Sequence, residues 1–465
     1  MGARSVTTSL LLLAACARTS PSVPEGVGAA PGVADVERDA EVPVEAAPAA
    51  SSDSATLAQL DPDGDDDPID PGSGPVPASM QFERVGRPPL SLQRICDLTP
   101  LGDALYASHA NQPLGTDGAT ITRYRPDDEK HPFTVAFDWN RPGEPTKGGG
   151  AGQGFLRVHA IGGRLFVPDT DPPYAGFGIA DHGTEGYVFV SDAEGTFARA
   201  VAPGHRPPAA PTPDADGRAG AGVVPRAYHV LDVIRFRGRL YASTGSVPPT
   251  ERAWTGASPG ALHVASPKWD RWTYEVDYPF PWKAGVWRLT YLERYRDRLY
   301  AGIEDYDGRD PDDYVVFAPG KDATAIGHDD ERGVRVSEHG ASLTLRWYAS
   351  AGKLWWIAID RGAGSVLRVT DDGDTWRIVP LPAEAGEPTD VVRYHDAVVA
   401  LTEWGLWRVD VDPPVALARV EGKRTPFRVD DAFCSAPLAV FRDQLYAGDQ
   451  RDGSLWRIAA AQLPR

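Results

Sequence analysis

A short pattern of apolar and polar positions recurs seven times along the chain. In each copy an apolar run leads into a turn and then into Leu-Tyr-Ala or a close variant. The copies begin at Leu105, Leu165, Leu240, Leu299, Leu354, Val398 and Leu445. Repetition of one strand pattern predicts a ring of small β-sheets, because each unit can bury its faces only against its neighbours.

Each repeat is expected to contain four strands. An apolar run before each copy predicts an inner strand, most clearly at residues 230–236 and 289–295. Third strands, usually opened by Gly, are predicted at 118–123, 186–191, 260–265, 314–318, 364–369, 405–409 and 453–458. Fourth strands are predicted at 196–201, 272–276, 376–379 and 415–420. The pattern therefore indicates an all-β protein, a seven-bladed β-propeller of four-stranded blades.

The last repeat lacks an outer strand of its own. After residues 453–458 the chain has only the Ala-rich segment 459–465, whereas residues 80–85 resemble a strand without a hairpin partner. We expect this N-terminal strand to pair as the outer strand of the seventh blade. Such pairing closes the ring and removes an exposed edge.

Composition is typical of an extracytoplasmic β protein. The 465 residues include 48 Gly, 43 Pro, 13 Trp and 16 Tyr but only 2 Met, which favours many short strands joined by turns. The net charge of −18 argues against a nucleic-acid partner, because it repels polyphosphate.

The N-terminus has the features of an export signal. Its apolar stretch, residues 6–15, is too short for a membrane span, which needs about 20 residues. The segment Leu13-Ala14-Ala15-Cys16 resembles a bacterial lipoprotein signal, which implies cleavage before Cys16, acylation of its thiol and attachment to the cell envelope. Ala17 in place of Asp implies the outer membrane or cell surface in some families. The alternative is an ordinary secretory peptide with an incidental cysteine.

Residues 16–77 are expected to form a disordered tether between the signal peptide (1–15) and the propeller (78–465). They are rich in Ala, Pro, Ser and acids, so they bury too little apolar area to fold. Within the tether, residues 61–67 are similar to the acidic calcium loops of dockerins and thrombospondin-type repeats. They lack a closing Glu and flanking apolar helices. We therefore interpret them as a solvated spacer and predict no cofactor, with calcium as the alternative.

One turn resembles a known family motif. Residues 369–376 read Val-Thr-Asp-Asp-Gly-Asp-Thr-Trp and resemble the Asp-box (BNR) turn of sialidases and related propellers, with Asp371, Gly373, Thr375 and Trp376 matching. Residues 192–197 form a degenerate copy. The resemblance implies a structural turn in which Asp accepts backbone hydrogen bonds and Trp packs between sheets. The arginine motif of sialidases is absent, so no catalytic residue is predicted.

Aligning the inner strands on the Leu-Tyr-Ala copies identifies candidate ligand-binding residues. Two registers carry polar side chains, Arg94, His229, Arg288 and Glu387 in one and Asp97, Arg157, Asp232, Tyr291 and Asp390 in the other. We expect them to ring the mouth of the central channel. They either form ion pairs around a wet channel or, with the nearby Trp404, bind a sugar or a peptide.

Three long insertions, at 140–154, 168–186 and 203–226, are predicted on one face of the first three blades. Long loops on a rigid scaffold often carry a binding site, and neutral expansion of Pro- and Gly-rich loops is the alternative.

Once Cys16 is acylated, Cys96 and Cys434 are the only thiols left, and they precede Leu105 and Leu445 by nine and eleven residues. The first and last blades adjoin in a closed ring, and export favours oxidation. A disulfide between them is therefore predicted, with two buried free cysteines as the alternative.

These observations predict a lipid-anchored envelope propeller that binds a glycan, a peptide or an envelope protein without catalysis. The alternative is an envelope glycoside hydrolase or lyase that uses carboxylates in the funnel. Hydrolysis needs paired carboxylates about 5 to 9.5 Å apart. An assembly or scaffold factor, a third possibility, would present a broad apolar patch.

Overall fold

The computed structural model describes residues 70–88, 94–110, 119–138, 154–170, 186–197, 221–224, 227, 229–245, 260–267, 269, 271–280, 286–305, 311–431 and 433–461. The predicted signal peptide, Cys16, the acidic residues 61–67 and most of the tether and the three insertions lie outside these residues. Their assignments remain predictions.

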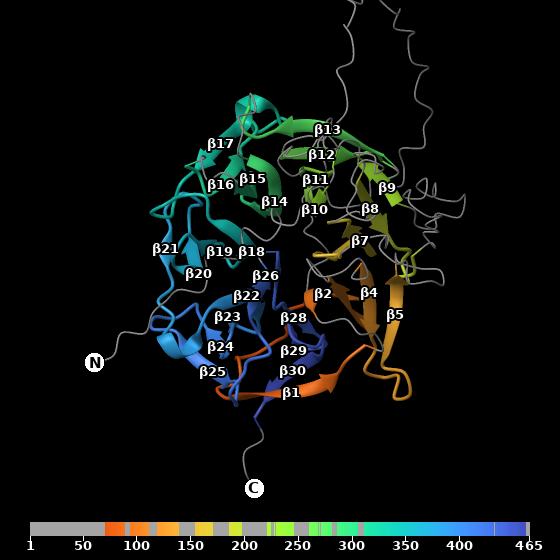
Figure 1. The fold of residues 1–465 in the computed structure, drawn as a ribbon, viewed down its shortest axis with the longest axis vertical. Coiled ribbons are helices and arrows are strands. Elements are labelled where there is room, and N and C mark those ends of the chain that lie inside the picture. Colours follow the sequence, from red (N-terminus) through yellow and green to blue (C-terminus); the bar gives the residue numbers. More distant parts are fainter. Residues whose placement is uncertain are drawn as a thin grey trace, which may run out of the picture. The chain divides into compact units, whose positions relative to one another are not determined.

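Regular structure in the described residues is almost entirely β. The two helices among them are short 3-10 turns, η4 (His328–Asp330) and η5 (Ala383–Ala385). Neither helix has the length or apolar character needed to cross a bilayer. The sheets are arranged around a common centre as a β-propeller (Figure 1).

Five sheets have four antiparallel strands each. The first contains β2 (Ile95–Leu101), β3 (Ala104–His109), β4 (Thr120–Tyr124) and β5 (Phe133–Asp138). The second contains β6 (His159–Ile161), β7 (Arg164–Pro168), β8 (Gly186–Val190) and β9 (Ala221–Val224). Two more contain β18 (Leu343–Ser350), β19 (Lys353–Asp360), β20 (Gly364–Thr370) and β21 (Arg377–Ile378), and β22 (Pro388–Tyr394), β23 (Ala397–Thr402), β24 (Gly405–Arg408) and β25 (Val415–Arg419). The last contains β28 (Leu438–Phe441), β29 (Gln444–Gly448), β30 (Leu455–Ala460) and β1 (Met80–Gly86).

The prediction of seven separate four-stranded sheets needs correction. The third and fourth repeats join into one eight-stranded sheet, made of β10 (His229–Phe236), β11 (Arg239–Gly245), β12 (Ala261–Ala265), β13 (Trp272–Asp277), β14 (Val286–Tyr295), β15 (Arg298–Asp305), β16 (Tyr314–Phe317) and β17 (Glu331–Val334). Its two halves are joined by one residue pair, Gly245 with Arg288, where β11 and β14 approach closely. A two-stranded hairpin, β26 (Val429–Asp431) and β27 (Cys434–Ser435), makes a further sheet.

The repeated apolar pattern forms the second strand of every unit. All seven copies begin at the second residue of β3, β7, β11, β15, β19, β23 or β29, and their first residues are buried. Neighbouring inner strands contact one another in the order β2, β6, β10, β14, β18, β22 and β28, except that β10 reaches the second sheet through β7. The repeats therefore follow one another around the ring, as predicted.

The N-terminal strand closes the ring as predicted. β1 pairs antiparallel with β30, from Met80 opposite Ala460 to Gly86 opposite Leu455. The Phe82 ring packs 5.1 Å from that of Phe427. An ion pair between Arg84 Nη2 and Asp452 Oδ2 at 2.6 Å lies at one end of this pairing. The edge that β30 would otherwise expose is thus covered.

The fourth strand of the second sheet differs from the prediction. It is β9, whereas residues 192–197 form a turn in which Asp192 Oδ1 accepts the Glu194 and Thr196 N–H groups at 3.0 and 2.8 Å. The small and apolar residues at 196–201 suit a turn as well as a strand, which explains the difference. Consequently the third insertion begins between the third and fourth strands, not between two sheets. That connection leaves the opposite end of the sheet from the β7–β8 connection.

The turn resembling an Asp-box uses a different aspartate from the one predicted. Asp372 Oδ1, not Asp371, accepts the Asp374 and Thr375 N–H groups at 2.8 and 2.7 Å. These bonds hold the pKa of Asp372 well below its usual range. Asp371 instead pairs with Lys353 Nζ at 2.6 Å. Gly373 has φ +83°, and a Cβ there would collide with the Tyr300 hydroxyl.

Trp376 packs between sheets, as the resemblance implied. Its ring lies 5.5 Å from Trp356 in its own sheet, and its Nε1 donates to the hydroxyl of Tyr314, on β16, at 2.8 Å.

The predicted disulfide between Cys96 and Cys434 is present, with 4.7 Å between the Cα atoms. Cys96 lies on β2, whereas Cys434 lies on the hairpin strand β27 and not on the inner strand β28 as expected. The bond therefore joins the first sheet to the hairpin that precedes the last one.

Reduction should weaken ring closure. The loop closed by the disulfide is long, so the bond contributes up to about 5 kcal/mol on the chain-entropy model. We expect the double variant Cys96→Ser/Cys434→Ser and the reduced wild-type protein to unfold at lower urea concentration than the oxidised protein, and at the same concentration as each other. An unchanged urea midpoint would contradict a role in closure.

Candidate functional site

β-Bulges orient one side chain from each of four inner strands. The register of β2, β10, β18 and β22 shifts by one residue directly before Asp97, Asp232, Arg346 and Asp390, respectively. A bulge adds an unpaired residue and redirects the side chain that follows it. The four residues therefore occupy equivalent positions at the centre of the ring.

The three aspartates each bond to the next unit. Asp97 Oδ2 accepts the Val158 N–H at 3.1 Å, Asp232 Oδ2 accepts that of Leu292 at 2.7 Å, and Asp390 Oδ2 accepts that of Leu438 at 2.7 Å. In each case the accepting carboxylate and the donating N–H belong to consecutive units of the ring. All three carboxylates are buried. They therefore hold neighbouring inner strands together.

Two arginines from other units reach these carboxylates. Arg346 Nη1 lies 3.1 Å from Asp97 Oδ1, and its Nε lies 3.4 Å from Asp390 Oδ2. Arg157 Nη1 lies 3.7 Å from Asp97 Oδ1, and its guanidinium covers the Tyr291 ring at 3.8 Å. These contacts join β18 to β2, and they join Arg157, two residues before β6, to β14. The centre is thus filled by a buried network of paired charges.

Burial dominates the electrostatics of this network. It raises the pKa of Asp390 to about 8, assisted by the charge of Asp97, and it also raises the pKa of Asp97. Asp232 is satisfied differently, because its Oδ1 contacts His159 Nε2 at 2.5 Å. Buried carboxylates need such partners to remain in a low-dielectric interior.

The predicted register of Arg94, His229, Arg288 and Glu387 is only partly brought together. Arg288 Nη2 donates to His229 Nε2 at 2.9 Å, and its Nη1 pairs with Glu304 Oε2 at 3.0 Å. The other nitrogen of His229, Nδ1, then donates to the Thr170 carbonyl at 2.6 Å, so the imidazole is neutral. Arg94 is half-buried, and its carbonyl accepts from His109 Nδ1 at 2.8 Å.

The β26–β27 hairpin lies over this part of the ring centre (Figure 1). The Tyr291 hydroxyl donates to the Phe433 carbonyl, and Arg288 lies 5.5 Å from the Phe433 ring. Phe433 precedes the disulfide-bonded Cys434. The hairpin therefore covers Arg288 and Tyr291 and is tied to the first sheet.

Glu387 and Trp404 are the predicted candidates that lie apart from the buried network. Glu387 is exposed, and its Oε2 accepts the Ser365 N–H at 3.3 Å. Its own N–H donates to Glu403 Oε2 at 3.3 Å. The adjoining Trp404 is half-buried, and its N–H bonds to the Ala385 carbonyl at 3.0 Å. Partial burial, then the charge of Glu403, raises the pKa of Glu387.

Arg346 and Glu403 were not among the predicted site residues. Arg346 stands eight residues before Leu354, the same spacing that separates Asp97 from Leu105. It therefore belongs to the same register and could have been predicted from the aligned repeats. Glu403 adjoins Trp404 but lies in a turn, outside the aligned inner strands.

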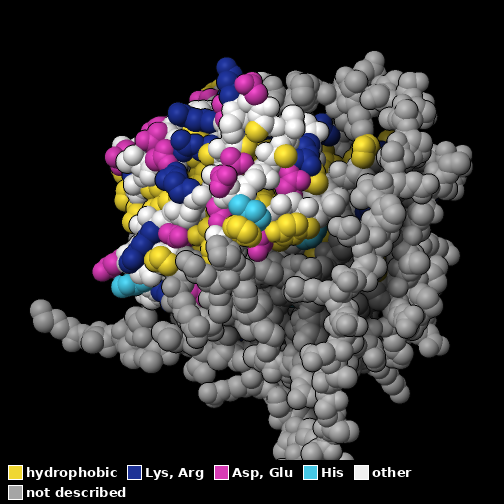
Figure 2. All heavy atoms as spheres, turned by 90° about the horizontal axis from the view of Figure 1, so that it is seen from above, with side chains coloured by type: hydrophobic (Ala, Val, Ile, Leu, Met, Phe, Trp, Pro, Cys, Tyr) yellow, Lys and Arg dark blue, Asp and Glu magenta, His cyan; other side chains and the backbone are white. Residues whose placement is uncertain are grey.

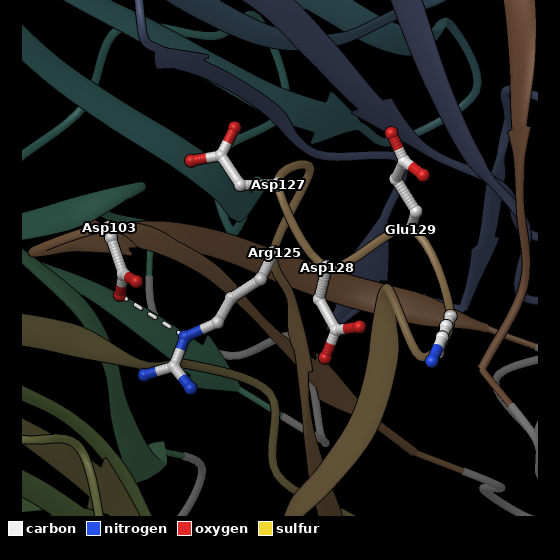
Figure 3. A pocket seen from close by; sticks show the side chains of 6 residues that line it. Asp103, Arg125, Asp127, Asp128 and Glu129 are labelled. Atoms are coloured by element: carbon white, nitrogen blue, oxygen red, sulfur yellow. Dashed lines mark hydrogen bonds and ion pairs between the residues drawn. The ribbon is translucent and has the colours of Figure 1, made fainter.

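A shallow charged depression lies elsewhere, beside the connection between β4 and β5. It is lined by Asp103, Arg125, Asp127, Asp128, Glu129 and Lys130. Arg125 Nε pairs with Asp103 Oδ1 at 3.1 Å (Figure 3). None of the predicted ligand-binding residues lines it. Within the described ranges, no three His, Cys, Asp or Glu side chains are grouped so as to hold a metal ion.

Comparison with known proteins shows the fold alone. No family model and no curated protein sequence matches the chain. Virginiamycin B lyase from Staphylococcus aureus is similar with a TM-score of 0.50 and 7% identity, over 82% of this chain and 100% of that one. The extracellular domain of the hybrid two component system BT4673 from B. thetaiotaomicron gives 0.49 and 11%, over 84% and 44%, and BamB from Moraxella catarrhalis gives 0.38 and 12%, over 83% and 99%. All three are β-propeller proteins. This chain spans less than half the length of the BT4673 chain.

Removing one carboxylate of the network should destabilise the fold. Asp232→Ala leaves the buried Leu292 N–H and His159 without their acceptor, at a cost of about 3 kcal/mol. The exposed Asp410, paired with Arg408 at 2.9 Å, provides a control, and Asp410→Ala should change stability little. Urea denaturation of both variants checks this. Equal stability of the two would contradict a structural role for Asp232.

Proposed function

We propose that the protein is a lipid-anchored, extracytoplasmic propeller of seven blades that binds a partner without catalysis. The seven blades are the five four-stranded sheets and the two halves of the eight-stranded sheet, β10–β13 and β14–β17. One residue pair joins these halves, whereas four or more join the first two strands within each half. Counting them as two blades also agrees with the seven copies of the strand pattern.

The bonding of the central carboxylates is the observation that carries the non-catalytic proposal. A hydrolase or lyase in the funnel needs acids or bases that reach a substrate. Asp97, Asp232 and Asp390 are buried and bonded to the backbone of the next unit. Such groups support the ring and leave little capacity for proton transfer to a ligand. Ligand binding by Arg157, Arg288 or Tyr291 stays a prediction, since the same burial limits their access.

The best supported binding surface is the rim formed by Glu387, Glu403 and Trp404. Two carboxylates offer acceptors for hydroxyl or amine groups, and a half-buried indole offers a flat apolar face. These are the recognition elements for an envelope glycan or peptide. The rim stands at the start of β22 and in the β23–β24 turn, on a rigid and fully described sheet.

Substitutions at the rim test the proposal. Glu387→Gln with Trp404→Ala should weaken binding of purified peptidoglycan fragments about tenfold or more, because an acceptor and a stacking face are lost. The melting temperature should change by only a few degrees. Isothermal titration with the wild-type and variant proteins measures both affinities. Arg419→Gln, which removes the partner of Glu384 nearby at 3.5 Å, is the matched control.

The same experiment can also support the alternative of a glycoside hydrolase or lyase. Release of shortened or unsaturated fragments by the wild-type protein, abolished in Glu387→Gln, would overturn the non-catalytic proposal.

The anchoring proposal rests on Leu13-Ala14-Ala15-Cys16, outside the described residues. Cys16→Ala should prevent acylation and leave an uncleaved or soluble protein. Detergent phase partitioning of both forms in a bacterial host checks this. Identical partitioning would contradict lipid attachment.

A further inference from the structure

The two outer strands of the eight-stranded sheet come together in a cluster of aromatic and titratable side chains. β13 and β17 are the terminal strands of that sheet. Beyond β13 the chain reaches Phe280, whose N–H donates to Glu331 Oε1, on β17, at 2.8 Å. The Phe280 ring stacks on His328, from η4, with 3.6 Å between centroids. Tyr274 Oη donates to Asp277 Oδ1 at 2.5 Å. We call Tyr274, Asp277, Phe280, His328 and Glu331 the edge cluster.

Two rings of the edge cluster are exposed to an unusual extent. Tyr274 is 45% exposed and Phe280 is 53% exposed. Figure 2 looks onto this end of the described residues and shows hydrophobic, histidine and acidic side chains next to one another at the surface. Exposing a large aromatic ring to water is unfavourable, and its open faces are available to a partner.

The acids of the edge cluster lack a strong cation. Among the described residues neither Asp277 nor Glu331 has an Arg or Lys partner, and the basic group paired with Asp277 is the imidazole of His328, at 3.8 Å. By contrast, the nearby Asp374 pairs with Arg298 at 2.9 Å and Arg332 at 2.6 Å. Glu331 Oε2 and His328 Nδ1 are also buried atoms without a hydrogen-bond partner in the described part of the chain. The edge cluster therefore carries negative charge that no Arg or Lys among the described residues balances.

We propose that the edge cluster binds a lysine or arginine side chain presented by a protein or peptide segment. The exposed rings would contact the cation through their faces, and Asp277 and Glu331 would supply the opposite charge. Other described titratable groups near the cluster are Asp312, whose Oδ2 accepts the Tyr278 hydroxyl at 2.9 Å, and Asp329 and Asp330 in η4. The basic groups nearby are His328, the buried His263, whose ring centroid lies 6.0 Å from that of Tyr274, and Arg332, which pairs with Asp374 at 2.6 Å. The outer strand β13 also offers main-chain groups to an extended segment.

Binding should depend on pH with a defined sign. Burial, with the charge of Asp277, raises the pKa of Glu331 to about 7. A cation binds the ionised carboxylate, so affinity should rise as the pH rises through about 7 and should fall below it.

The test uses labelled hexalysine and the intact protein, with fluorescence anisotropy at pH 6 and pH 8. We expect tighter binding at pH 8 than at pH 6. Glu331→Gln and Tyr274→Ala should each weaken binding at pH 8 about tenfold, and Glu331→Gln should also flatten the pH dependence. Both side chains are partly exposed, and the melting temperature of each variant is measured to show that it folds.

Two controls separate this site from general attraction to an acidic protein. Glu384→Gln removes an exposed acid elsewhere, and Val415→Ala trims an exposed outer-strand residue, so neither should alter the affinity. An equal loss in Glu331→Gln and Glu384→Gln would overturn the proposal in favour of non-specific attraction. Binding of neutral chitohexaose that requires Tyr274 but not Glu331 would overturn it in favour of a glycan surface. The rim residues Glu387 and Trp404 take no part, so the fate of the proposed function is measured separately.

Discussion

The structure depends on a hydrogen bond from the backbone of one inner strand to a buried carboxylate of the strand before it. Asp97, Asp232 and Asp390 each make this bond, with distances of 2.7 to 3.1 Å. A buried carboxylate is costly without partners, so both the bulge that orients it and the Arg or His side chain that pairs with it are needed. Arg346 serves two of these aspartates at once. Packing between sheets and polarity at the ring centre are therefore not separate properties.

Because the centre is bonded in this way, the binding surfaces proposed above lie outside it. The side chains that a funnel would use are bonded to one another, and the hairpin carrying Phe433 covers Arg288 and Tyr291. Acidic and aromatic groups with spare capacity lie instead at the Glu387 rim and at the edge cluster. Both stand on strands or turns held by the ring, so they can recognise a partner without being required for folding.

Much of the architecture could be predicted from the sequence, because strand patterns and strand pairing obey local rules. The seven second strands, the closing strand β1 and the Cys96–Cys434 bond follow from spacing along the chain. Spacing also placed Asp97, Arg157 and Asp232 in one register. Spacing could not show whether these charged side chains face solvent or one another. That depends on contacts between residues up to 250 positions apart, such as the bond from Arg346 Nη2 to the Cys96 carbonyl. The choice between Asp371 and Asp372 likewise depends on turn geometry, and the edge cluster joins strands that carry no shared pattern.

The pairing of β1 with β30 determines when the ring can close during synthesis of the chain. The first strand of the domain finds its partner only when the last strand has been synthesised. Until then the hydrogen-bonding edge of β1 is open to other chains. Pairing between strands this far apart in the sequence is also slow. At the proposed extracytoplasmic location, oxidation of the Cys96 and Cys434 thiols would make the closed state covalent.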